Sequence, residues 1–216
     1  PICQPWDLDR LYGGVHTLPP YEQAKGTDWY KGTANAIYQN ISFIDSYDPE
    51  YVIILSGDQI CKQDYADFLR FHKEKGAEFS VAVMEVDWKE ASRFGLMVAD
   101  ENDKITEFQE KPPVPKSNLA SMGIYIFNWD VLKKYLEEDE ADPNSKNDFG
   151  MNIIPALLRD GRKMYAYHFN GYWRDVGTID SLWEANMEVL DPENSGIDIF
   201  DEKWKIYSRN PVLPAQ

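Results

Sequence analysis

A short aliphatic run that ends in a carboxylate constrains this chain more than any other feature. Residues 51–55 are a tyrosine and four aliphatic residues, and Ser56, Gly57 and Asp58 follow directly. An unbroken apolar run of this length predicts a strand that is buried on both faces of a parallel sheet. Ligands of open α/β sheets bind just beyond the carboxyl ends of such strands, where Asp58 would suit a hard cation such as Mg²⁺. A plain strand-to-loop turn at Gly57 and Asp58 explains the same residues equally well.

The composition excludes several classes of protein. The 216 residues include 22 basic and 37 acidic side chains, and the net charge of −15 argues against a nucleic-acid partner. The two cysteines, Cys3 and Cys61, have no metal-ligand spacing and fit a reduced setting without a disulfide. No apolar run approaches the ~20 residues of a membrane span, and there is no signal peptide. We therefore expect a cytoplasmic location and no membrane partner.

Strand-like and helix-like segments alternate along the chain, which is typical of an α/β nucleotide-binding fold. Besides the run at 51–55, the patterns predict strands at 14–18, 79–83, 94–98, 105–108, 119–127, 165–169 and 204–207. They predict helices at 33–44, 64–76, 88–93, 129–136, 148–161 and 178–190, with Thr33, Asp64 and Thr178 as N-caps. Residues 137–147 are acidic and polar and read as an exposed loop.

A few polar residues stand out as candidates for a site. Asp175 ends an extended segment, as Asp58 does, and is a second candidate ligand for a metal. Glu110 and Lys111 precede a proline, where the lysine would meet a phosphate and the carboxylate would accept sugar hydroxyls, although a solvated loop is the commoner explanation. Gly32 ahead of a helix would let a ligand reach backbone N–H groups, and an ordinary glycine explains it as well. His72 is expected to be a half-buried core residue.

Several segments together resemble bacterial glucose-1-phosphate adenylyltransferases over almost the whole chain. They are residues 5–10, 13–15, 29–36, 56–58, 108–112, 119–125, 148–150 and 172–178. The resemblance implies a Rossmann-like, GT-A-like nucleotidyltransferase domain with a mixed, mostly parallel sheet flanked by helices. It implies that ATP and glucose 1-phosphate give ADP-glucose and pyrophosphate, in glycogen biosynthesis, in a homo- or heterotetramer.

The resemblance also implies a role for each matching residue. Asp58 and Asp175 would hold Mg²⁺ at the α-phosphate, and Lys111 would grip glucose 1-phosphate. The sugar side would be lined by Glu110, Ser121, Tyr125, Asp148, Trp173 and Gly95. The nucleotide side would be lined by Trp29, Tyr30, Gly32 and Thr33.

The chain departs from the family pattern in two respects. Gln59 and Cys61 stand where the family usually has histidine and tyrosine, which leaves their effect on activity open. The family's glycine-rich phosphate loop is not found before Pro1, and the left-handed β-helix that follows the catalytic domain in the family is missing apart from its start. We expect a partial catalytic domain over 1–190, a linker with the first strand of a β-helix over 191–216, and little or no activity of this chain alone.

Two other functions remain open at this level. A non-catalytic regulatory subunit of the same assembly would share the fold, but it would be free to lose Asp58, Asp175 and Lys111, which are all present. Another sugar-1-phosphate nucleotidyltransferase would share the metal and sugar residues and differ in its preferred nucleoside triphosphate.

Overall fold

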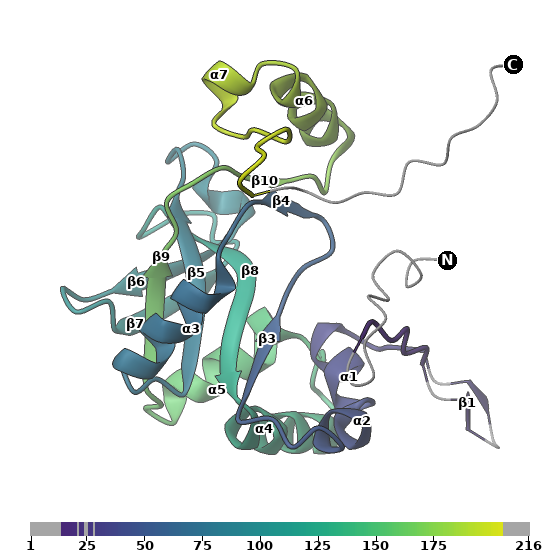
Figure 1. Cartoon of the computed structure of the whole chain (residues 1–216). Coiled ribbons are helices and arrows are strands. Elements are labelled where there is room, and N and C mark those ends of the chain that lie inside the picture. Colours follow the sequence, from purple (N-terminus) through teal and green to yellow (C-terminus); the bar gives the residue numbers. More distant parts are fainter. Residues whose placement is uncertain (1–13, 21, 24–25, 28, 205–216) are drawn as a thin grey trace, which may run out of the picture. The chain divides into compact units, whose positions relative to one another are not determined.

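The computed structural model describes residues 14–20, 22–23, 26–27 and 29–204 (Figure 1). The chain divides into two compact units, one of residues 20–173 and one of residues 1–19 and 174–216. The motif at 5–10 and most of the strand predicted at 204–207 lie outside the described residues. The boundary expected near residue 190 stays a prediction.

A mixed sheet is the centre of the larger unit. From one edge to the other its strands are β7 (Ile105–Glu110), β6 (Gly95–Ala99), β8 (Leu119–Asn128), β5 (Phe79–Glu85) and β9 (Met164–His168), and β3 (Tyr51–Ile54) also pairs with β8. Of the pairings described in this sheet, only that of β5 with β9 is parallel. The mixed α/β fold is therefore confirmed, whereas the expected predominance of parallel pairing is not found in this part of the chain.

The aliphatic run at 51–55 forms a strand, but its environment differs from the expectation. β3 runs antiparallel to β8, with Tyr51 opposite Asn128. The side chains of Ile53 and Leu55 are 41% and 48% exposed, so the run is not buried on both faces. An apolar run indicates a strand, but its partners and burial depend on segments far away in the sequence.

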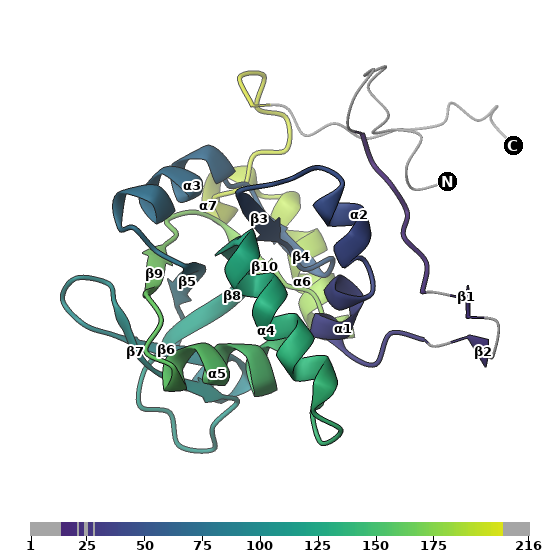
Figure 2. The same ribbon diagram turned by 90° about the horizontal axis from the view of Figure 1, so that it is seen from below.

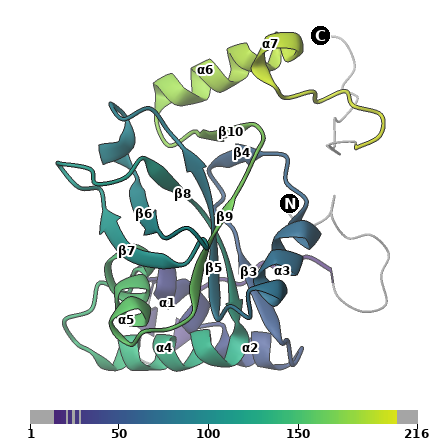
Figure 3. The same cartoon turned by 90° about the vertical axis from the view of Figure 1, so that its left-hand side faces the viewer.

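Helices cover both faces of the sheet. One face packs against α1 (Thr33–Tyr38), α4 (Trp129–Ala141), the π-type turn η3 (Phe149–Ile153) and α5 (Ile154–Arg159). The other face packs against α3 (Tyr65–Glu74). Successive side chains of β8 point to opposite faces of the sheet. Tyr125 and Phe127 therefore pack on the face covered by α1, α4 and α5, whereas Ile124 and Ile126 pack on the face covered by α3. In Figures 2 and 3, α1, α4 and α5 lie together and α3 lies apart from them.

Six further described elements are short, and two of them alter the expected boundaries. They are β1 (Glu22–Gln23), β2 (Gly26–Thr27), α2 (Ile41–Asp45), β4 (Gln59–Cys61), the 3₁₀ turn η2 (Ala91–Arg93) and β10 (Trp173–Asp175). The helix predicted over 33–44 is broken into α1 and α2. The helix predicted over 88–93 is reduced to η2, and the strand predicted at 14–18 is not formed.

Local sequence signals located most helix ends correctly. Asp64 caps α3 by accepting a hydrogen bond from the Ala66 N–H at 2.8 Å, and Gly76 follows the helix at φ +56°. The strands predicted at 94–98 and 105–108 are formed by β6 and β7, which pair antiparallel. Thr33, in contrast, is not an N-cap, because Gly32 occupies that position and the Thr33 hydroxyl bonds to another helix.

The predicted loop at 137–147 is partly helical, because α4 continues to Ala141. Glu140 explains the extension, since its carboxylate accepts hydrogen bonds from Lys31 Nζ at 2.9 Å and from Asn35 Nδ2 at 2.8 Å. Lys134 and Glu138 add an i,i+4 ion pair on the exposed side. The acidic side chains of this segment thus have partners that stabilise the helix.

His72 is fully buried rather than half-buried, and both of its ring nitrogens are bonded. Nδ1 lies 2.8 Å from Ser80 Oγ, and Nε2 lies 2.9 Å from Asn128 Oδ1. Because the amide oxygen only accepts, Nε2 carries the proton and Nδ1 accepts from the serine. Burial lowers the pKa of His72. The hydrogen bond to Asn128 opposes this shift, and the nearby charge of Lys73 adds to it.

We expect this histidine to destabilise the protein in mild acid. A folded-state pKa below the ordinary 6.5 means that the unfolded chain binds more protons, so stability falls as the pH drops from about 6.5. His72→Gln keeps one donor and one acceptor but does not titrate. The thermal unfolding midpoint of this variant should therefore fall less steeply than that of the unmodified protein between pH 7 and pH 5. Equal slopes would contradict the assignment, and the exposed His168→Gln provides the control.

In the smaller unit, two helices follow β10. Thr178 caps α6 (Ile179–Val189) as predicted, with its hydroxyl accepting from the Ser181 N–H at 3.1 Å in a capping box. A short helix, α7 (Pro192–Ser195), follows and ends at Gly196.

Within the described part of the chain, the helices lack the combination of length and apolar character that crossing a bilayer requires.

Candidate active site

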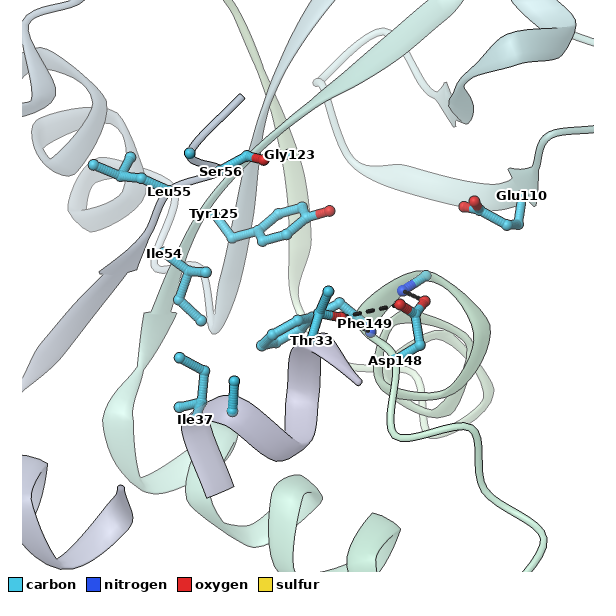
Figure 4. A pocket seen from close by; sticks show the side chains of 13 residues that line it. Thr33, Ile37, Ile54, Leu55, Ser56, Glu110, Gly123, Tyr125, Asp148 and Phe149 are labelled. Carbon is cyan, nitrogen blue, oxygen red and sulfur yellow. Dashed lines mark hydrogen bonds between the residues drawn. The ribbon is translucent and has the colours of Figure 1, made fainter. Parts of the chain in front are cut away.

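A cavity of about 460 Å³ opens in the larger unit beyond the end of β3 (Figure 4). Its walls come from α1, from the turn after β3, from the end of β7, from β8 and from the start of η3. The lining residues are Thr33, Ala36, Ile37, Ile54, Leu55, Ser56, Gly57, Glu110, Gly123, Tyr125, Asp148, Phe149 and Gly150. One side is thus aliphatic, while the other carries two carboxylates and several hydroxyls.

The Asp148 side chain is held in place by three hydrogen bonds at the start of η3. Its Oδ1 accepts from the N–H groups of Gly150 at 2.9 Å and Met151 at 3.0 Å, as an N-cap does. Its Oδ2 accepts from the Thr33 hydroxyl at 3.0 Å, and that hydroxyl oxygen in turn accepts from the Phe149 N–H at 3.1 Å. Thr33 and Asp148, which are far apart in the sequence, therefore fix the geometry of this wall together.

Glu110 lies between two glycines at the end of β7. It pairs in register with Gly95 on β6, and a Cβ on Gly95 would stand 3.0 Å from its Oε2. A Cβ on Gly150 would stand only 2.7 Å from the same oxygen. The carboxylate thus occupies a space that exists because neither neighbour has a side chain. Burial raises the pKa of Glu110, and nearby Asp148 acts in the same direction while Lys111 opposes it.

Tyr125 supplies a hydroxyl at the centre of the cavity. In Figure 4 it points into the open space that Glu110 and Asp148 border. Burial raises the pKa of Tyr125 to about 12, the bond to Ser121 opposes this, and the two carboxylates add to it. The phenol therefore stays protonated and can donate a hydrogen bond at any physiological pH.

Lys111 follows Glu110 in a strained backbone conformation. Its φ of +44° lies in the left-handed region, although the next residue is a proline, which favours an extended conformation at this position. Its Nζ lies 4.0 Å from Glu110 Oε1, and its side chain is 66% exposed. Backbone strain of this kind concentrates at functional sites, which agrees with a binding role for this lysine.

The two candidate metal carboxylates belong to different units. Asp58 is exposed in the turn between β3 and β4, and one of its oxygens accepts from the Ser56 hydroxyl. Asp175 is in the smaller unit, and its Oδ1 accepts from the Gly177 N–H at 2.8 Å. The described residues hold no cluster of three or more histidine, cysteine or acidic side chains suited to a metal. The pairing of Asp58 with Asp175 stays a prediction.

The four residues expected on the nucleotide side share no single environment. Trp29 is 76% exposed, and the Tyr30 hydroxyl accepts from Asn40 Nδ2 at 3.0 Å. Gly32 approaches the chain's own backbone, because a Cβ there would stand 2.4 Å from the Asn147 carbonyl oxygen. That contact supports the plain structural interpretation of Gly32. Of these four residues only Thr33 lines the cavity.

The sugar-side residues are divided between the cavity and its surroundings. Glu110, Tyr125 and Asp148 line it, Gly95 packs against Glu110, and Ser121 bonds to Tyr125. Trp173 is buried among apolar side chains and donates its indole N–H to Gln59 Oε1 at 2.9 Å. A direct sugar contact by Trp173 remains a prediction.

Sequence reasoning missed some residues that shape the cavity. Gly150 and Gly123 lie inside recognised motifs, but nothing in the sequence alone singles them out. Gln59 was noted only as a departure from a family pattern, and its position directly after Asp58 was the available signal.

Comparisons with known proteins identify the family of this chain. Residues 8–192 match the family model described as nucleotidyl transferase. Glucose-1-phosphate adenylyltransferases from Clostridium beijerinckii, Clostridium acetobutylicum and Desulforamulus reducens are 66%, 64% and 61% identical over 100%, 100% and 98% of this chain. These alignments cover 55%, 56% and 53% of the relatives, so the chain spans about half the length of the curated relatives it matches. The matched family model covers most of the chain, which therefore belongs to the nucleotidyl transferase family.

Proposed function

We propose that the protein containing this chain transfers the adenylyl group of ATP to glucose 1-phosphate and releases pyrophosphate. One observation carries the sugar-phosphate part: the cavity combines two carboxylates and three hydroxyls with a lysine at its rim. Carboxylates and hydroxyls suit the hydroxyls of a sugar, and a lysine suits a phosphate. The relatives named glucose-1-phosphate adenylyltransferase support the choice of ATP and glucose 1-phosphate.

In this proposal the residues of the cavity bind and orient the sugar phosphate. Glu110 and Asp148 accept hydrogen bonds from sugar hydroxyls, and the protonated Tyr125 donates one. Lys111 neutralises the phosphate of glucose 1-phosphate, whose oxygen attacks the α-phosphorus of ATP as the bond to pyrophosphate breaks. Little acid–base chemistry is required, because positioning and charge neutralisation carry most of a phosphoryl-type transfer.

Mg²⁺ fits the donors that Asp58 and Asp175 offer. Both side chains present hard carboxylate oxygens, and one oxygen of Asp175 has no hydrogen bond among those found in the described residues. Mg²⁺ needs only one or two protein carboxylates and completes its octahedron with water and phosphate oxygens. When bound, it would stabilise negative charge on the reacting phosphates. A cytoplasmic location and a tetrameric assembly belong to the same proposal and rest on the family resemblance.

The proposal is tested by binding and turnover of a lysine variant. In the intact protein we expect Lys111→Ala to weaken glucose 1-phosphate binding roughly 10- to 100-fold by calorimetry, because a charge-assisted hydrogen bond contributes about 1.5–3 kcal/mol. Binding of ATP should change little. Lys116→Ala is the matched control, since Lys116 is exposed on the same loop and pairs with Glu107 at 2.6 Å.

The same experiment separates the competing functions. A regulatory subunit would bind ligands without producing ADP-glucose, and another nucleotidyltransferase would prefer a different triphosphate in parallel assays. Unchanged glucose 1-phosphate affinity in Lys111→Ala would contradict the role given to this residue.

A further inference from the structure

Gln59 makes a hydrogen bond that the proposed chemistry does not use. Its Oε1 accepts from Trp173 Nε1 at 2.9 Å. The indole N–H only donates, so this contact fixes which end of the Gln59 amide carries the oxygen. The Trp173 ring is 9% exposed and packs 5.5 Å from the Phe94 ring, so its N–H would lose its partner without Gln59.

The nitrogen of the same amide faces the bulge in β8. Gly123 has a φ of +68°, and a Cβ on it would stand 3.2 Å from Gln59 Nε2. Gly123 lines the cavity, two residues before Tyr125. One side chain therefore bonds to the buried tryptophan and lies beside the part of the cavity wall where Gly123 leaves room for it.

The positions of the two bonded residues in the sequence give this contact its meaning. Gln59 directly follows Asp58, and Trp173 is two residues before Asp175. The hydrogen bond itself lies within the larger unit, and Asp58 is the carboxylate of that unit which the proposed function assigns to Mg²⁺. We propose that Gln59 is a positioning residue, which fixes the turn after β3 through its bond to Trp173 and so orients the carboxylate of Asp58 for the metal ion.

This inference rests on the proposed function, and it requires one particular property of the side chain at position 59. The residue must accept a hydrogen bond from an indole. Methionine has a similar length but is at best a weak acceptor, so Gln59→Met should remove the effect. A neutral histidine has one accepting nitrogen, so Gln59→His should keep the effect at pH 8.

The chain offers a matched control four residues away. Gln63 is also buried, but neither atom of its amide has a hydrogen-bond partner. Gln63→Met is thus the same chemical change in the same segment without loss of a bond. We expect it to leave ligand binding unchanged and to raise the unfolding midpoint, because an unsatisfied buried amide destabilises the folded state.

The test measures ADP-glucose binding to the intact protein by calorimetry, with and without Mg²⁺. Without pyrophosphate no reaction follows, so the readout is an equilibrium constant rather than turnover. We expect Gln59→Met to weaken the Mg²⁺-dependent binding about tenfold, in line with one lost hydrogen bond, and the Mg²⁺-free binding less than about twofold. Gln59→His should bind ADP-glucose at pH 8 as tightly as the unmodified protein does.

Each alternative outcome is decisive. A lower unfolding midpoint in Gln59→Met with unchanged Mg²⁺-dependent affinity would show an ordinary core hydrogen bond and overturn the positioning role. Equal losses with and without Mg²⁺ would also overturn it, because the effect would then not act through the metal carboxylates. Absence of ADP-glucose binding by the unmodified protein would contradict the proposed function itself, and this inference with it.

Discussion

Gly150→Ala is expected to weaken glucose 1-phosphate binding at least about tenfold while leaving the protein folded. The new Cβ would stand 2.7 Å from Glu110 Oε2, a separation too short for any carbon–oxygen contact, so the carboxylate must move. The carboxylate occupies the space that Gly95 and Gly150 leave open, so its new position must lie away from Gly150. Displacement costs the hydrogen bonds to the sugar, each worth about 1.5–3 kcal/mol when the acceptor is charged.

Two measurements separate this effect from general damage. Alanine has a higher helix propensity than glycine by about 1 kcal/mol, so the start of η3 should not be weakened by the substitution itself. A double-mutant cycle with Glu110→Gln should be strongly non-additive, because Gly150→Ala can remove the Glu110 contribution only once. Additive losses in binding would show that Gly150 acts independently of Glu110.

Local signals predicted the parts of the fold that depend on neighbouring residues. Asp64, Asp148 and Thr178 each mark a helix start because their side chains accept from N–H groups two or three residues further on. Such bonds are decided within one turn of chain, so the sequence suffices to place them.

The strand at 51–54 shows where this reasoning stops. Its aliphatic side chains identify a strand, but its antiparallel partner is β8, more than sixty residues later in the sequence. Whether such a run is central or partly exposed depends on which segments reach its two edges, and local composition contains no information on that. Thr33 fails for the same reason, because its hydroxyl bonds to Asp148 and the Phe149 N–H instead of its own helix.

The sequence nominates residues for the candidate site, but it does not predict how they are arranged. The family resemblance indicates Glu110 and Asp148 as site residues. Only the fold shows that the end of β7, with Glu110, lies near the start of η3, with Asp148. Gly95 and Gly150 make room for Glu110, and this role can be recognised only from their distances to Glu110 in the folded chain. Gln59 is similar, since its function depends on Trp173, which lies 114 positions later.

Asp58→Asn should lower kcat/KM of the intact protein at least about a hundredfold, since stabilisation of phosphate charge by a metal is worth several kcal/mol. Asparagine keeps the size of the side chain and can still accept from the Ser56 hydroxyl, which bonds to Asp58 in the structure. Only the negative charge that would attract Mg²⁺ is lost. The variant should therefore fold normally and bind glucose 1-phosphate as before in the absence of Mg²⁺.

Asp48→Asn is the matched control for this prediction. Asp48 is exposed just before the same strand, and its φ of +47° is a conformation that asparagine tolerates well. The control should keep full activity, so a loss confined to Asp58→Asn points to the charge at that position. Comparable kcat/KM in the two variants would rule out Asp58 as a metal ligand, and the search for the metal carboxylates would then begin with Glu110 and Asp148, which already share the cavity.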